Sequence, residues 1–220
     1  MTTWMTRTLS GASVQYVFRP EESTAPSIST QRHLLSDSSL AYSFNGVSYN
    51  LACPRRKPNK GAIPGLFILT KDGSRCGRIF LRRSIGTIAH QFIYYSMELG
   101  DDRYDMYVVG FGSEGLKCPI YKGSTQVALI EKDLEASPGM DCYEITTVTA
   151  QDTLPATLLG LYLDMYVYAN LGDVIHAPNK RVYYTTTNKS LKAMYSPDFK
   201  QIFAGGNPGL NERSYAYENY

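Results

Sequence analysis

The stretch DTLPATLLGLYLDMYVYAN, residues 152–170, is the most apolar in the chain, with one aspartate in its interior. It is too long for a strand, and its apolar residues are not confined to alternate positions. Asp152 or Thr153 can cap its beginning, and Pro155 falls in the first turn, where its missing N–H does no harm. A glycine follows it, as is common after a helix. We therefore predict a helix over about residues 154–171.

This helix is apolar nearly all the way round. Its polar face is a narrow stripe made of Thr157, Gly160, Asp164 and Tyr168. A helix with so little polar surface must be surrounded by lipid or by protein. The residues that we expect to form the buried core of the helix are Leu158, Leu159, Tyr162, Leu163, Asp164 and Tyr166.

A protein environment suits this helix better than a membrane. A helix of this length reaches about 27 Å, which is marginal for a hydrocarbon core of about 30 Å. A carboxylate near its centre would cost about 2.5–3.5 kcal/mol on insertion. We expect no transmembrane span. Inside a protein, Asp164 needs a hydrogen-bonding partner on the surrounding wall, because a buried unpaired carboxylate is costly.

The chain before the helix is typical of β structure. Tyrosine is far more frequent than phenylalanine, 18 against 8, which suits strands with one wet face. Asn45-Gly46 and Asp72-Gly73 are two-residue hairpin turns between apolar runs. Short strands recur at intervals of about 8 to 12 residues, the rhythm of a sandwich or barrel. We predict a mainly β protein: a closed antiparallel β-barrel of about 10–12 strands that encloses the central helix.

Three regions follow from this pattern. Residues 1–37 are an N-terminal strand and a polar loop, and residues 38–171 form the barrel with its helix. Residues 172–220 are a C-terminal extension packed on or beside the barrel. Within the extension we predict a strand over 180–187 and a short helix over 196–206.

Charge is unevenly distributed along the chain, although the formal net charge is only +2. Nine Lys or Arg and a single Asp lie between Cys53 and Arg83, whereas ten acidic and four basic residues lie between Glu98 and Glu144. A local positive excess attracts anionic lipid headgroups or nucleic acid. Solvated strand edges and loops give the same composition, so a surface without a ligand is the alternative.

Nothing in the sequence indicates an enzyme. His90 with the aspartates of the following turn, or Cys118 with a histidine, could be assembled into a site, but no motif fixes them together. Four cysteines and three histidines are scattered without metal-ligand spacing, so we expect no metal and no cofactor. The N-terminus lacks a secretory signal, which favours a cytoplasmic location.

Two stretches resemble the tubby C-terminal-like superfamily, which includes tubby-like, LURP-one-related and phospholipid scramblase proteins. PIYKGSTQVALIEKD (119–133) is similar to its paired strands, and YEITTVTAQDTLPATLLGLYLDMYVYAN (143–170) is similar to its closing strand and apolar helix. Asp152 and Asp164 occupy the positions of two aspartates of that helix segment. The resemblance covers about residues 38–171. Unlike the family pattern, 49 residues follow the helix here, and the proline-rich N-terminus and cysteine cluster of scramblases are absent.

The resemblance implies a non-enzymatic domain, peripheral to a membrane, that binds anionic phospholipid or a protein partner. In the tubby branch a basic pocket outside the barrel holds a phosphoinositide headgroup. A nucleic-acid-binding or small-ligand-binding barrel is the alternative, and an enzyme is the least favoured class. The candidate headgroup ligands are Arg55, Arg56, Lys57, Lys60, Arg78, Arg82 and Arg83.

Overall fold

The structure is a computed structural model of the chain, and it describes residues 1–10, 13–21, 28–33, 39–52, 66–132, 140–164 and 184–204. It is mainly β, with few helices. The strands are β1 (Thr2–Ser10), β2 (Ser13–Pro20), β3 (Ile28–His33), β4 (Ser39–Phe44), β5 (Val47–Ala52), β6 (Phe67–Lys71), β7 (Ser74–Arg83), β8 (Ile93–Leu99), β9 (Asp102–Met106), β10 (Val109–Gly112), β11 (Leu116–Lys122), β12 (Thr125–Lys132), β13 (Met140–Thr147) and β14 (Tyr184–Thr185). The helices are α1 (Thr153–Tyr162), α2 (Lys189–Lys192) and α3 (Phe199–Ala204), with single 3-10 turns η1 (Ile88–His90) and η2 (Ala150–Asp152).

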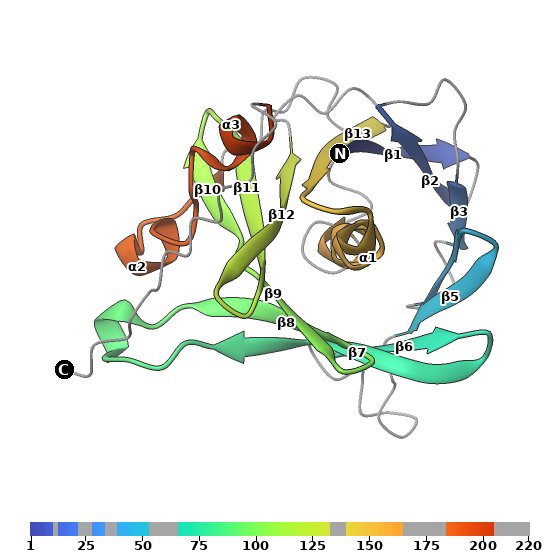
Figure 1. The fold of residues 1–220 in the computed structure, drawn as a ribbon, viewed down its shortest axis with the longest axis horizontal. Coiled ribbons are helices and arrows are strands. Elements are labelled where there is room, and N and C mark those ends of the chain that lie inside the picture. Colours follow the sequence, from blue (N-terminus) through green and yellow to red (C-terminus); the bar gives the residue numbers. More distant parts are fainter. Residues whose placement is uncertain are drawn as a thin grey trace.

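Twelve of the strands form one continuous antiparallel path in the order β3-β2-β1-β13-β12-β11-β9-β8-β7-β6-β5-β4. Along this path the paired strands are consecutive in the chain, except that β1 pairs with β13 and β9 pairs with β11. The two-residue turns at Asn45-Gly46 and Asp72-Gly73 have positive φ at each of their residues, the conformation that suits the twist of a tight hairpin. Figure 1 shows the path curling around α1.

The prediction of a closed barrel needs correction, because the sheet is open. The hydrogen-bonded path ends at β3 on one side and β4 on the other, and no backbone pairing between these strands is seen in the described residues. They nevertheless lie side by side. Closure requires the end strands to approach to the ladder spacing of about 4.7–4.9 Å with matched backbone groups. Side chains join the two ends instead: the ring of Phe18 on β2 meets the ring of Tyr42 on β4 edge-to-face, with centroids 5.4 Å apart.

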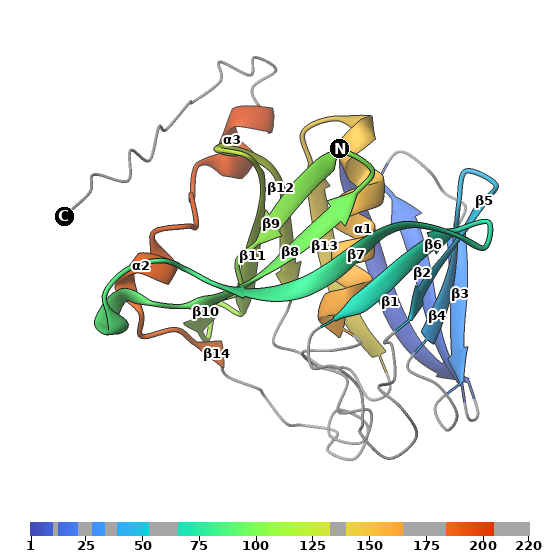
Figure 2. The ribbon, with the colours of Figure 1, turned by 90° about the horizontal axis from the view of Figure 1, so that it is seen from below.

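α1 lies in the hollow of the curled sheet (Figures 1 and 2). The helix begins at Thr153 and ends at Tyr162, so the described helix is shorter than the predicted one. Leu163 and Asp164 continue it in a wider turn, and residues 165–171, with Tyr166 and Tyr168, lie outside the described residues. Every residue from Pro155 to Asp164 is buried, as a helix apolar on all sides requires.

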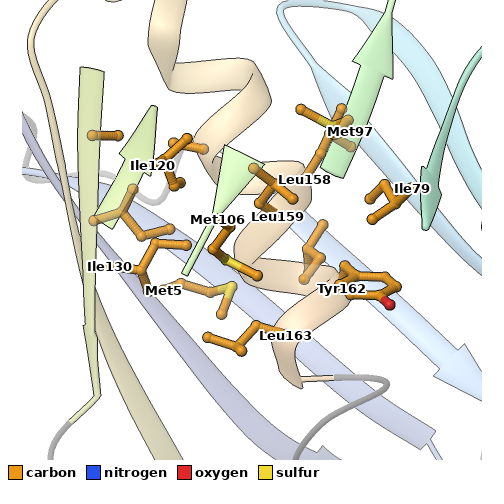
Figure 3. Packing of buried hydrophobic residues seen from close by; sticks show 14 of the residues in the cluster. Met5, Ile79, Met97, Met106, Ile120, Ile130, Leu158, Leu159, Tyr162 and Leu163 are labelled. Carbon is orange, nitrogen blue, oxygen red and sulfur yellow. The ribbon is translucent and has the colours of Figure 1, made fainter. Parts of the chain in front are cut away.

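The core is formed by the inner face of the sheet and the helix. Figure 3 shows Ile79 of β7 and Met97 of β8 on one side of the helix, and Met5 of β1 and Ile130 of β12 on the other. Gly160 allows the close approach of the second side, since a Cβ there would lie 3.2 Å from the Ile145 side chain. The alternating inward residues of the strands thus supply an apolar wall for the helix.

Residues 184–204 pack outside the sheet. β14 pairs with β10 and is shorter than the predicted strand, of which residues 180–183 lie outside the described part. α2 was not predicted; its N-cap is Asn188, whose side chain accepts a hydrogen bond from the Leu191 amide at 2.9 Å. α3 begins at Phe199, later than predicted, and ends one residue before Gly205.

A second, smaller core holds α2 against the outside of the sheet. It is centred on Tyr107, Val109 and Tyr121, and Leu191, Met194 and Tyr195 pack on it from the α2 region. The Tyr121 hydroxyl donates to the carbonyl of Met194 at 2.8 Å. The α2 segment is therefore anchored by apolar burial and not only by the short β14 pairing.

Candidate functional site

The structure describes part of the predicted headgroup surface. Arg55, Arg56, Lys57 and Lys60 lie outside the described residues. Arg78, Arg82 and Arg83 lie on β7, whose alternation puts Arg78, Phe80 and Arg82 on the outer face. Arg83 is on the other face, with Ile79. Because the part of the strand near Arg83 runs past the hydrophobic core, Arg83 is exposed even though it is on the inner-facing side.

Arg78 forms an ion pair with an acidic residue of the neighbouring strand. The register of β7 and β8 places Arg78 directly opposite Glu98, and the two side chains form a bidentate pair: Nε to Oε2 at 2.6 Å and Nη2 to Oε1 at 3.0 Å. Hydrogen bonding from Arg78 lowers the pKa of Glu98. The guanidinium also lies 4.8 Å from the centre of the Phe80 ring. Its charge is therefore largely neutralised within the sheet.

Arg82 and Arg83 have no direct acidic partner like that of Arg78, although the charge of Arg82 contributes to lowering the pKa of Glu98. Neither forms an ion pair with a carboxylate of the described chain. The Arg82 guanidinium lies 6.0 Å from the ring centres of Phe80 and of Tyr94, which holds it over the outer face of the hairpin. Of the seven residues selected from the sequence, these are the described ones that could contact a headgroup.

The turn between β7 and β8 is ordered by internal hydrogen bonds. The Ser84 amide donates to the carbonyl of Phe92 at 2.9 Å, and the Phe92 amide donates to the Ser84 hydroxyl at 2.9 Å, which fixes the base of the turn. The Gln91 side chain donates to the carbonyl of Gly86 at 2.9 Å, across the turn. The rest of the turn is η1, in which the His90 amide donates a 3-10 hydrogen bond to the carbonyl of Thr87 at 2.8 Å.

α2 supports this turn from the side and carries two lysines, of which Lys192 has its ammonium 5.7 Å from the centre of the Phe111 ring on β10. The Asn188 side chain donates to the carbonyl of Gln91 at 3.0 Å, and the Ser190 hydroxyl lies 3.4 Å from Nδ1 of His90. Lys189 and Lys192 are exposed on α2. Sequence reasoning missed these lysines, because they are about 100 residues from β7 and only the tertiary structure joins the two segments. Figures 1 and 2 show α2 beside the far ends of β7 and β8.

Asp164 forms a separate cluster in the interior. It accepts hydrogen bonds from the hydroxyls of Tyr16 at 2.6 Å and Tyr143 at 2.5 Å, and from Nη1 of Arg7 at 3.1 Å. Arg7 comes from β1, Tyr16 from β2 and Tyr143 from β13, so the carboxylate ties the helix to adjacent strands. These are the wall partners that the sequence requires but does not identify. The cluster is buried, which suits a structural role.

The described residues offer little for chemistry of another kind. No three His, Cys, Asp or Glu side chains among them come together as metal ligands. Cys118 is fully buried, and burial raises the pKa of its thiol to about 12, so it is a poor nucleophile. Among the same residues, no helix has the length and apolarity needed to cross a lipid bilayer.

Comparisons of the chain with protein-family models, with curated proteins and with solved structures each find no match. The resemblance to the tubby C-terminal-like superfamily stays a prediction that rests on the two stretches of sequence at 119–133 and 143–170.

Proposed function

We propose that this chain is a non-enzymatic module that attaches peripherally to membrane surfaces rich in anionic phospholipid. The observation that carries the proposal is the cationic end of the β7–β8 hairpin. There Arg82 and Arg83, without an ion-pair partner in the described chain, lie near the α2 side that carries Lys189 and Lys192. The chain has no Asp or Glu between Asp72 and Glu98 to oppose them.

The expected binding is electrostatic and sensitive to salt. Each Lys or Arg near an anionic leaflet contributes about 1 kcal/mol, so the four cations together could contribute about 4 kcal/mol. The attraction decays within a Debye length of about 8–10 Å at physiological salt. The cations therefore have to lie close to the lipid surface, as they can at the protruding end of a hairpin.

The resemblance to the tubby C-terminal-like superfamily supports the same class of function. It predicts a cytoplasmic domain in which a barrel surrounds the apolar helix. The buried helix is in line with this expectation, since Pro155–Asp164 are buried within the curled sheet, but the sheet stays open between β3 and β4. Arg55, Arg56, Lys57 and Lys60 are further candidate ligands on the evidence of the sequence alone.

Sedimentation with vesicles tests the proposal. The protein should pellet at low salt with phosphatidylcholine vesicles that contain phosphatidylglycerol, and not with phosphatidylcholine alone. The double variant Arg82→Glu/Arg83→Glu should lose most of the pelleting. The matched control is Lys71→Glu/Arg75→Glu, which reverses two exposed cations at the opposite end of β7. Each double variant shifts the formal net charge from +2 to −2, so a difference between them reports position and not net charge.

The outcomes separate the classes of partner. Failure of the unmodified protein to bind anionic vesicles at low salt would overturn the proposal. Equal loss in the two double variants would show a nonspecific charge effect. Retention of a DNA or RNA probe, with indifference to vesicles, would favour the nucleic-acid class. The triple variant Arg55→Glu/Arg56→Glu/Lys57→Glu tests whether the remaining predicted residues belong to the surface.

A further inference from the structure

Exposed apolar side chains gather on the β7–β8 hairpin. Six large hydrophobic residues are exposed in the described part of the chain, and four of them belong to this hairpin. Ile85 and Ile88 stand at its turn with 97% and 90% of their surface exposed, and Leu81 and Ile93 stand below them with 40% and 47%. Single exposed apolar residues are ordinary on protein surfaces, but a cluster at a protruding turn marks an interaction site.

The turn that carries Ile85 and Ile88 is held at its base by its own hydrogen bonds, which pair groups of Ser84, Gly86, His90 and Phe92. Such a turn suits the interfacial layer of a bilayer and not its hydrocarbon core, where each unsatisfied N–H or C=O costs several kcal/mol. Asn188 of the α2 segment holds it from outside at the carbonyl of Gln91. The isoleucines are therefore presented on a preorganised support.

The charges around this turn are arranged for an anionic surface. Arg82 and Arg83 directly precede the turn, and Ile93, opposite Arg83, begins the returning strand. From the tip of the hairpin inward, the apolar turn therefore comes first, the two arginines come next and the folded sheet follows. Long basic side chains keep their heads at headgroup level while apolar neighbours enter the acyl boundary.

We propose that Ile85 and Ile88 insert into the acyl boundary of an anionic membrane, with Arg82 and Arg83 at headgroup level. The inference rests on the proposed function and deepens it, since it adds a hydrophobic contribution that salt does not screen. A phospholipid surface fits these residues better than a protein pocket, because the cations flank the isoleucines without an acidic residue among them. A protein partner is an outcome of the test below.

Removing the apolar turn should weaken attachment and leave electrostatic recruitment in place. The variant Ile85→Ser/Ile88→Ser should reduce vesicle partitioning about 10-fold for each isoleucine that inserts fully, because about 1.4 kcal/mol corresponds to a factor of ten. The fold-loss should be the same at low and at high salt, because salt screens the arginines and not the hydrophobic contribution. The matched control is Trp4→Ser, which removes an exposed apolar side chain from β1 and should leave partitioning unchanged.

A fluorescent reporter separates insertion from mere proximity. In the variant Trp4→Phe/Ile88→Trp, the introduced indole should shift its emission to the blue on anionic vesicles and be quenched by lipids brominated on the acyl chains. The unmodified protein, whose single tryptophan is Trp4 on β1, should show neither effect. Circular dichroism and thermal melting confirm that each variant folds.

The possible failures are distinguishable. If the unmodified protein binds anionic vesicles, but Ile85→Ser/Ile88→Ser binds equally well and the introduced indole is not quenched, insertion is overturned while the proposed function stands. If the unmodified protein binds no vesicles, the proposed function fails and the insertion fails with it. Burial of the indole by an added protein, without any response to vesicles, also overturns the proposal.

Discussion

Replacement of Asp164 by asparagine tests whether the buried ionic cluster fixes the helix within the sheet. The side chain is fully buried and accepts hydrogen bonds from Arg7, Tyr16 and Tyr143 at 3.1, 2.6 and 2.5 Å. Asparagine has nearly the same shape but no charge, and its NH2 group is a donor where three donors already converge. Arg7, itself 5% exposed, would lose its carboxylate. Breaking a buried pair in this way costs about 3–5 kcal/mol.

That cost is a large share of the free energy of unfolding, which is about 5–15 kcal/mol for a typical domain. Urea denaturation measures it directly, and the fluorescence of Trp4, the single tryptophan, reports unfolding from β1, the strand that carries Arg7. The matched control is Asp102→Asn, which removes a half-exposed carboxylate 2.8 Å from Lys122. A surface pair of this kind contributes at most about 1 kcal/mol.

A double-mutant cycle separates the interaction between Arg7 and Asp164 from the other effects of each substitution. Arg7→Met should also destabilise, and the double variant Arg7→Met/Asp164→Asn should lose less than the sum of the single changes, because the interaction between the two side chains is then lost only once. The reasoning would be refuted if Asp164→Asn cost no more than Asp102→Asn. Strict additivity of the two single changes would refute the direct coupling.

Three further predictions concern packing and pH. Gly77→Ala should destabilise by more than about 2 kcal/mol in urea denaturation, because its Cβ would lie 2.1 Å from the backbone oxygen of Glu98; tolerance of alanine would contradict the pairing of β7 with β8. Gly160→Val should cost about 1–3 kcal/mol by overpacking against Ile145, whereas Gly160→Ala should cost less, and equal melting temperatures for the two variants would count against this packing. Burial raises the pKa of Cys118 from 9.0 to about 12, so the unfolded thiol ionises first and the free energy of unfolding should fall as pH rises from about 9 to 12. Cys118→Ala should show a shallower decline in the same titration, and an unchanged slope would argue against a buried thiol.

Local sequence signals predicted the secondary structure well where the chain imposes its own geometry. The turns at Asn45-Gly46 and Asp72-Gly73 are in the expected place because these residue pairs accept positive φ with little strain. The start of α1 followed from Pro155. Asp152 stands at the N-cap as expected but makes no capping hydrogen bond to α1, because its carboxylate accepts from the Thr149 amide and hydroxyl instead. α2 was missed because four residues form a helix only when packing and the Asn188 cap hold them.

The candidate site could be predicted from the sequence less completely than the secondary structure. The sequence selected Arg78, Arg82 and Arg83 together as candidate headgroup ligands, and its alternation put Arg83 on the other face of the strand, but it gave no partner for any of the three charges. Strand register then placed Glu98 opposite Arg78 and left the other two without such a pair. No sequence signal singled out Ile85 and Ile88, which the structure shows exposed at the turn between β7 and β8.

The sequence by itself determined that the chain is mainly β and that the apolar segment after residue 152 is a helix surrounded by protein. Periodicity, turn chemistry and the carboxylate of Asp164 are local properties, and they carry that information without a fold. Only the tertiary structure decided that the sheet stays open between β3 and β4, and that Arg7, Tyr16 and Tyr143 meet Asp164. Those contacts join residues up to 157 positions apart, and their geometry depends on strand order and register, which no local pattern encodes.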